Sequence, residues 1–135
     1  MNMTKLLAWV FLSLLLSGPG LVFADIPERF IGTWIMEVDT SPGFPWWDQI
    51  KHPVRLSITK DAINFDDQAG CSCTPKAFFY DDELDALVFK HCLPTKSDLA
   101  FTPFYRMKSK DRKLVGEVWT YKLLFKLYGH SEQKQ

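Results

Sequence analysis

The chain has 135 residues, and its 16 Lys and Arg balance its 16 Asp and Glu, so the formal net charge is zero. That length suits one domain with one modest core, and the neutral balance excludes a strong overall attraction to nucleic acid or to an anionic membrane. The charge is uneven, because residues 25–95 carry 6 basic and 12 acidic side chains, whereas residues 96–135 carry 9 and 4. Such a split either orients an encounter with a charged partner or reflects separate acidic and basic hairpin turns.

The first 24 residues have the three-part pattern of a secretory signal peptide. Lys5 precedes an apolar stretch over residues 6–16, a Gly-Pro-Gly sequence at 18–20 ends it, and Ala24 places a small residue before the expected cleavage point. An uncleaved anchor is the alternative. We predict a mature chain of residues 25–135, secreted or periplasmic, in which no further apolar run is long enough to span a membrane.

Apolar residues recur at a spacing of two through most of the mature chain, which is typical of half-buried strands. The first predicted strand spans Phe30–Asp39, with Trp34 and Met36 on one side. The segment Thr40–Gln49 holds two Pro, one Gly and three aromatic residues, which predicts a long loop with a short helical turn near its end. The sequence then predicts, in chain order, hairpins of strands 52–59 with 62–66 and 76–80 with 85–90, strands at 104–108 and 114–121, and a last strand or short helix at 123–128.

Sequential strands joined by short turns lie side by side and antiparallel. Seven to eight short strands of this kind predict an all-β protein with an up-and-down antiparallel barrel, because closing the sheet removes its exposed edges. An open sandwich is the alternative. The domain organisation expected is a signal peptide at 1–24, a single β-barrel domain at 25–130 and a flexible tail at 131–135.

The opening strand carries a resemblance to a known family. The sequence Phe30-Ile31-Gly32-Thr33-Trp34 resembles the Gly-x-Trp opening strand of lipocalins and their calycin relatives, and the predicted strand order is similar to theirs. The resemblance implies an eight-stranded lipocalin-like barrel that holds a small, often apolar ligand. It also implies a basic residue late in the barrel that packs over the tryptophan, for which Arg106 and Lys122 are the candidates.

Three cysteines, Cys71, Cys73 and Cys92, flank the second hairpin. A two-residue loop at 82–83 places Cys73 opposite Cys92, and a tip one residue earlier places Cys71 opposite Cys92. Either disulfide suits an oxidising compartment and leaves one thiol. A metal site that adds His91 is the alternative, but Cys-x-Cys is not the spacing of structural zinc, and neighbouring strand residues point to opposite faces. We therefore predict a disulfide and no metal or cofactor.

The aromatic residues of the long loop are the candidate functional feature. Three of them are costly to expose together, so they either cap the core, form the rim of a ligand cavity or anchor a protein contact. We predict a non-catalytic protein that binds a small hydrophobic or amphipathic ligand at the barrel mouth. The ligand-binding residues expected are Trp34, Phe44, Trp46, Trp47 and Trp119.

The alternative function is an envelope protein-interaction module, an inhibitor or assembly accessory, with a filled barrel and no ligand cavity. Its expected contact is the acidic tip Asp81–Glu83 or the basic segment 106–113. The sequence holds no Gly-x-Ser-x-Gly motif and three histidines, so it offers no catalytic constellation. Export and the neutral net charge argue against a nucleic-acid partner.

Overall fold

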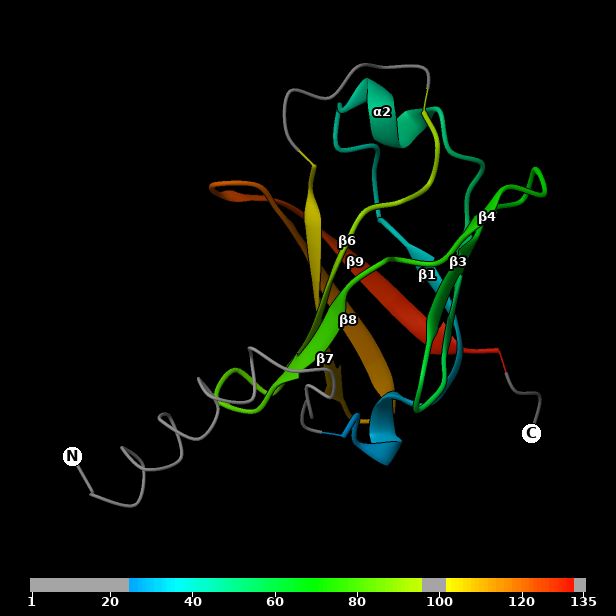
Figure 1. The fold of residues 1–135 in the computed structure, drawn as a ribbon. Helices are drawn as coiled ribbons and strands as arrows, with labels where there is room; N and C mark the ends of the chain where they lie inside the picture. Colours follow the sequence, from blue (N-terminus) through cyan, green and yellow to red (C-terminus); the bar gives the residue numbers. More distant parts are fainter. Residues whose placement is uncertain (1–24, 96–101, 133–135) are drawn as a thin grey trace.

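A computed structural model describes residues 25–95 and 102–132 of the chain, and the predicted signal peptide lies outside these residues. The described chain is nearly all β-structure (Figure 1). The strands are β1 (Gly32–Glu37), β2 (Val54–Ile58), β3 (Ile63–Asp66), β4 (Ser72–Cys73), β5 (Phe78–Asp81), β6 (Ala86–Lys90), β7 (Phe104–Lys110), β8 (Lys113–Trp119) and β9 (Leu123–Ser131). Two short helices accompany them, the 3-10 turn η1 (Glu28–Phe30) and the helix α2 (Pro45–Asp48).

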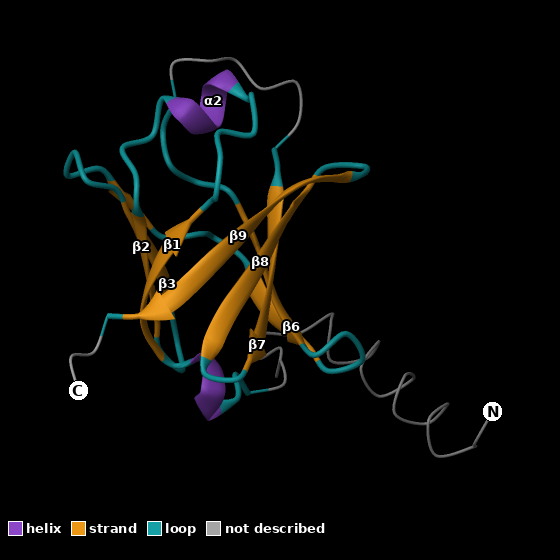
Figure 2. Cartoon of the chain, turned by 180° about the vertical axis from the view of Figure 1, so that it is seen from behind, coloured by secondary structure: helices purple, strands orange, loops and turns teal. Residues whose placement is uncertain are grey.

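The strands form one antiparallel sheet in the order β4-β3-β2-β1-β9-β8-β7-β6-β5. Consecutive strands are therefore neighbours except β4 and β5, which lie at opposite edges, and the pairing of β1 with β9 joins the two halves of the sheet at its middle. The sheet curls into an incomplete barrel (Figures 1 and 2). The predicted all-β, up-and-down fold is confirmed. It differs in having nine strands, and within the described residues no ladder joins β4 to β5.

The core occupies the inner face of the curled sheet. Alternate residues point inward, as the spacing of two predicted, so that Val54, Leu56 and Ile58 of β2 are each no more than 1 % exposed. The other strands contribute buried residues in the same way: Trp34, Met36, Ile63, Phe65, Leu87, Phe89, Tyr105, Met107, Leu114, Val118 and Leu127. One continuous apolar cluster thus fills the barrel from one end to the other.

The two short helices lie at opposite ends of this core (Figure 2). At one end η1 buries Phe30, and at the other α2 buries Trp46 and Trp47. The sequence Phe44-Pro45 positions α2, because proline suits the first turn of a helix, where its missing N–H has no partner to lose. The short helical turn predicted near the end of the long loop is therefore present.

Several boundaries differ from the prediction. In the second hairpin Asp81 lies opposite Ala86, so its turn has four residues and not the two that placed Asp81 opposite Leu84. The segment 123–128 is a strand, and β9 continues to Ser131, which pairs with Trp34 of β1. Ser131, the first residue of the expected tail, is therefore still part of the sheet. No helix in the described ranges has the length and apolar character that crossing a bilayer requires.

Candidate functional site: the interior and ends of the barrel

The α2 end is closed by aromatic rings that pack against one another at tilted and edge-on angles. Trp46 and Trp47 are only 6 % and 1 % exposed, and their ring centroids lie 6.0 Å apart in an edge-on arrangement. Trp47 lies 5.3 Å from the ring of Phe125 on β9 and 4.5 Å from that of His52, whose Nε2 is 2.9 Å from the Trp47 carbonyl oxygen. Because these rings face each other and the core, they form a plug; we call Phe44, Trp46, Trp47 and Phe125 the aromatic plug.

A shallow pocket of about 360 Å³ adjoins the aromatic plug where β1 leads into the loop. Its lining includes Glu37, Val38, Trp47, Asp48 and His52. Two carboxylates and one imidazole lie beside a surface that is more apolar than polar. A purely apolar ligand would strip water from those carboxylates without pairing them, which is costly.

Trp34 lies at the other end of the barrel, next to η1. Its indole nitrogen donates a hydrogen bond of 2.9 Å to the carbonyl oxygen of Phe30, and the side chain is only 5 % exposed. A pocket of about 520 Å³ opens beside it, bounded by η1, the β7–β8 turn and the end of β9. The residues that line this pocket are Arg29, Ile31, Gly32, Trp34, Ser109, Asp111, Arg112 and Ser131.

A polar contact fixes η1 against the second hairpin. The Arg29 guanidinium donates to the Tyr80 hydroxyl at 3.1 Å and forms a short ion pair with Asp85, which also accepts a hydrogen bond from Tyr80. We call Arg29, Tyr80 and Asp85 the η1 latch. Its hydrogen bond from Tyr80, together with Arg29, lowers the pKa of the Asp85 carboxyl. Both charged groups are about half exposed, so water screens the contact.

Trp119 points away from the barrel interior. It follows the inward-facing Val118 at a shift in the β8–β9 register, and its ring lies 4.5 Å under the guanidinium of Arg106. The basic residue expected over Trp34 is therefore elsewhere, because Arg106 covers Trp119 and Lys122 lies near Tyr121. Neither Arg106 nor Lys122 therefore makes the lipocalin-like pairing with Trp34.

The middle of the barrel is tightly packed. A methyl group added at Gly129 would lie 2.2 Å from the sulfur of Met36, and one added at Gly116 would lie 2.6 Å from the sulfur of Met107. Both methionines are fully buried, so each fills the space that a glycine leaves open on the neighbouring strand. The rings of Phe65, Phe89 and Tyr105 complete this layer, with centroids 5.1 to 5.4 Å apart.

A buried polar pair connects this layer to the aromatic plug. His91 Nδ1 lies 2.7 Å from the hydroxyl oxygen of Tyr105, and the His91 ring is 5.2 Å from that of Trp46. Burial lowers the pKa of His91 from 6.5 to about 4, and it raises the pKa of the Tyr105 hydroxyl well above its usual value. At neutral pH both groups are uncharged, and the Tyr105 hydroxyl can donate to the imidazole.

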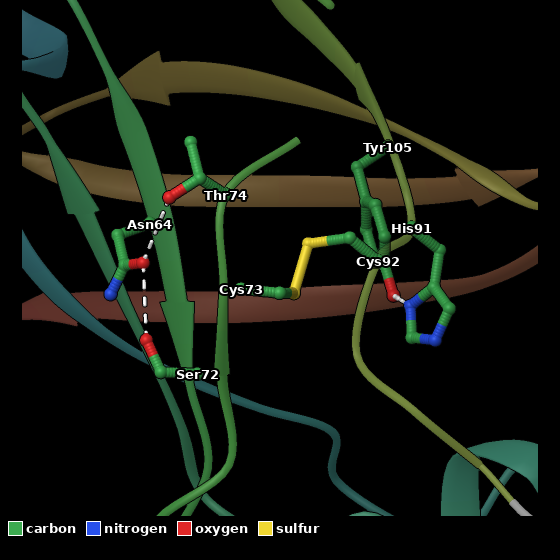
Figure 3. Close-up of a disulfide and its surroundings, with 7 residues drawn as sticks. All are labelled: Asn64, Ser72, Cys73, Thr74, His91, Cys92 and Tyr105. Carbon is green, nitrogen blue, oxygen red and sulfur yellow. Dashed lines mark hydrogen bonds between the residues drawn. A yellow bond between two sulfur atoms is a disulfide. The ribbon is translucent and has the colours of Figure 1, made fainter. Parts of the chain in front are cut away.

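Cys73 and Cys92 form a disulfide, with their Cα atoms 5.9 Å apart (Figure 3). Cys73 ends β4 and Cys92 follows β6, so the bond crosses the opening where the two edges of the sheet are not paired. Cys71 remains a free, half-buried thiol. The bond therefore pairs two residues that the sequence also paired, but it spans two edges and is not a cross-strand pair within one hairpin.

The expected ligand-binding residues do not converge on one mouth. Phe44, Trp46 and Trp47 gather at the α2 end, Trp34 lies at the η1 end and Trp119 lies on the outer face. The described residues hold no cluster of three or more His, Cys, Asp or Glu placed to bind a metal ion. The sequence reasoning missed the η1 latch and the His91–Tyr105 pair, although the position of His91 beside a disulfide cysteine was a signal that it lies near the core.

Comparisons with protein-family models, with curated proteins and with solved structures found no match to this chain. The function must therefore be argued from the geometry of the chain itself.

Proposed function

We propose that this protein is an exported, non-catalytic interaction module that binds a protein partner through its outer surface. The observation that carries the proposal is the filled interior. A carrier needs a pocket that surrounds its ligand, whereas here Met36, Met107 and three aromatic rings occupy the middle of the barrel. The aromatic plug that would frame a mouth is itself part of the core.

The disulfide supports the exported part of this proposal. Disulfides persist in oxidising compartments and are rare where cellular reductants act. The buried His91 and Tyr105 support the non-catalytic part, since each is the other's hydrogen-bond partner beneath the aromatic plug and away from solvent. A general base must instead reach its substrate's proton.

The β5–β6 hairpin is the contact surface that we favour for the partner. Phe79 and Leu84 are 43 % and 44 % exposed there, next to the exposed carboxylates of Asp82 and Glu83. The turn is held in shape, because the Asp81 carboxylate accepts hydrogen bonds from the backbone N–H groups of Glu83 and Leu84. A rigid tip with apolar and acidic groups loses little conformational entropy on binding, which favours affinity.

Photo-crosslinking in the exporting cell tests this function. A photoreactive residue at Leu84 should give one discrete adduct with a protein, and the same residue at exposed Lys60, on a different turn, should give none. Replacement of Asp82 and Glu83 by Lys should remove the Leu84 adduct. In parallel, fatty acids and other amphipathic molecules should leave the tryptophan fluorescence and melting temperature unchanged. Saturable ligand binding, or no adduct at Leu84, would contradict the proposal.

The pocket at the η1 end favours a second candidate function, the binding of a small amphipathic anion. Its volume of about 520 Å³ lies in the range of small-molecule sites, and it combines the apolar Ile31 and Trp34 with the guanidinium of Arg112. Arg112→Ala should then abolish binding of such a ligand, while Arg55→Ala, on the outer face of β2, should not. Isothermal titration calorimetry of the two variants tests this second candidate function, and equal binding by both variants would contradict it.

A further inference from the structure

We propose that the outer face of β7, β8 and β9 docks on a membrane surface rich in anionic lipid headgroups. The inference does not depend on the protein partner proposed above, because it concerns a different surface. We call this surface the basic face and define it by three cations, Arg106, Lys108 and Lys126, and three apolar residues, Phe104, Trp119 and Leu123.

The strand register brings these residues together. Arg106 lies opposite Glu117, which lies opposite Lys126, and Phe104 lies opposite Trp119, which lies opposite Leu123. On β7, β8 and the central part of β9 these residues alternate with buried ones such as Tyr105, Val118 and Leu127, so they point outward. Leu123 joins them because a register shift in the β8–β9 ladder places it opposite Trp119. Two adjacent rows therefore run across the three strands, one charged and one apolar.

The charged row has an excess of positive charge. Glu117 is its single carboxylate and is shared by two cations, at 4.0 Å from Arg106 and 3.8 Å from Lys108. Lys126 is exposed on the neighbouring strand, and Lys90 is exposed beside Phe104. The seven-residue strands β7 and β8 make the face about 23 Å long. This local positive charge complements a layer of anionic lipid headgroups. The net charge of the whole chain is zero, so it does not reveal this local excess.

The apolar row is suited to the interface between headgroups and acyl chains. Arg106 stacks on Trp119, so a cation lies directly against an amphipathic ring. Side chains of both kinds suit a membrane interface, because each combines an apolar part with a polar end.

The β8–β9 hairpin extends the apolar row beyond the neighbouring strands (Figure 2). Its tip carries Tyr121, which is 79 % exposed, and Lys122, and Leu123 at its base is 38 % exposed. An aromatic residue flanked by a lysine is typical of segments that enter the headgroup region.

The shape of the basic face favours a bilayer over an acidic protein. None of the three pockets around Trp34, Trp47 and Arg55 includes a residue of this face. A protein partner typically anchors aromatic residues in pockets, whereas a bilayer also accepts the convex outer face of a curled sheet with a projecting hairpin. The outer face of β2 and β3 offers no such match, since Asp66 there neutralises Arg55 at 3.6 Å.

Vesicle sedimentation tests the proposal with the mature chain alone. We expect binding to vesicles of phosphatidylcholine mixed with phosphatidylglycerol, no binding to phosphatidylcholine alone, and loss of binding as salt rises. Each surface cation removed should weaken binding about fivefold. The variant Lys108→Gln/Lys126→Gln should thus bind roughly 25-fold more weakly. The matched control Lys60→Gln/Lys76→Gln, which removes the same charge elsewhere, should change binding less than twofold.

Tryptophan fluorescence gives a second readout. Trp34, Trp46 and Trp47 are buried, so a blue shift on adding anionic vesicles reports Trp119, and Trp119→Phe should abolish it. Equal binding to neutral vesicles, equal loss in both charge variants, or binding to a soluble acidic protein but not to vesicles would each overturn the proposal. A missing crosslink at Leu84 would contradict the protein-partner function but not the membrane proposal. Failed vesicle binding would contradict the membrane proposal but not the protein-partner function.

Discussion

The two ends of the barrel close the same core with different chemistry. At the α2 end, rings such as Trp47 and Phe125 bury one another, and two polar groups of the layer below, His91 and Tyr105, pair with each other. At the η1 end an exposed latch of Arg29, Tyr80 and Asp85 holds a 3-10 turn beside an open pocket. Apolar burial is worth more than screened ion pairs, so we infer that the aromatic plug contributes more to stability than the η1 latch does.

The largest expected effect is at the aromatic plug. Trp47→Ala should lower the free energy of unfolding by about 3 to 5 kcal/mol, because it leaves a cavity in a closely packed core. The indole nitrogen of Trp47 has no hydrogen-bond partner among the described residues, so the loss is one of packing. Urea unfolding measures it. Tyr121→Ala, at a 79 % exposed site, is the control and should change stability by less than about 0.5 kcal/mol. Similar losses from both variants would contradict the comparison.

The next effect concerns the disulfide, which lies toward the α2 end because Cys92 adjoins His91. Cys73→Ser should lower the free energy of unfolding by about 3 kcal/mol, since the bond closes a loop with a sequence separation of 19. Cys71→Ser is the matched control and should change little, because that thiol is free. Thiol titration of the native chain should find one reactive group, and three groups would refute the bond. Amide exchange in the Cys73→Ser variant should rise around β4 and β6 before it rises at η1.

Acid should affect the α2 end before the η1 end. Burial lowers the pKa of His91 from 6.5 to about 4. Between these two pH values the unfolded chain binds a proton at His91 and the folded chain does not. Stability is then full above pH 6.5 and falls as the pH drops toward about 4, by on the order of 2 to 3 kcal/mol. His91→Gln should flatten this part of the pH profile of urea midpoints, and exposed His130→Gln should not. An unchanged slope in His91→Gln would mean that the imidazole is not buried as described.

The spacing of two was enough to predict most of the strands, because inward and outward residues alternate along a strand. It left 123–128 open as a strand or a short helix, and it did not predict β4. It also separated Trp119 from Val118 and grouped it with Glu117, which is the signal that its ring lies outside the barrel. Periodicity does not tell which end of a barrel a residue closes. The sequence analysis therefore predicted Trp34 and Trp46 at the same mouth of the barrel, although η1 and α2 place them at opposite ends.

The second hairpin shows why register could not be predicted. A two-residue turn and a four-residue turn fit the same acidic tip, and the longer one forms because Asp85 adopts a φ of 52°, which aspartate tolerates better than most residues. The disulfide then depends on where β4 lies, at the far edge of the sheet from β5. That placement results from the pairing of β1 with β9, a contact between the two ends of the chain that no local pattern contains.

The smallest expected effect is at the η1 latch. Arg29→Ala removes an exposed ion pair, so it should lower the melting temperature less than the Cys73→Ser variant does. Added salt should reduce the difference in melting temperature between Arg29→Ala and the unmodified chain.

The pKa of the Asp85 carboxyl is lowered by its hydrogen bond from Tyr80 and by Arg29. The η1 latch therefore stabilises the fold above the usual aspartate pKa, and this stabilisation is lost as the pH falls through the lowered value. This window lies below that of His91, so the two ends should lose stability in separate steps. Lys60→Ala, which removes the cation of a more exposed pair with Glu28, is the control for charge alone. If Arg29→Ala is as damaging as Trp47→Ala, or if it flattens the pH profile in the window assigned to His91, then the η1 latch bears on the core and the two ends are not independent.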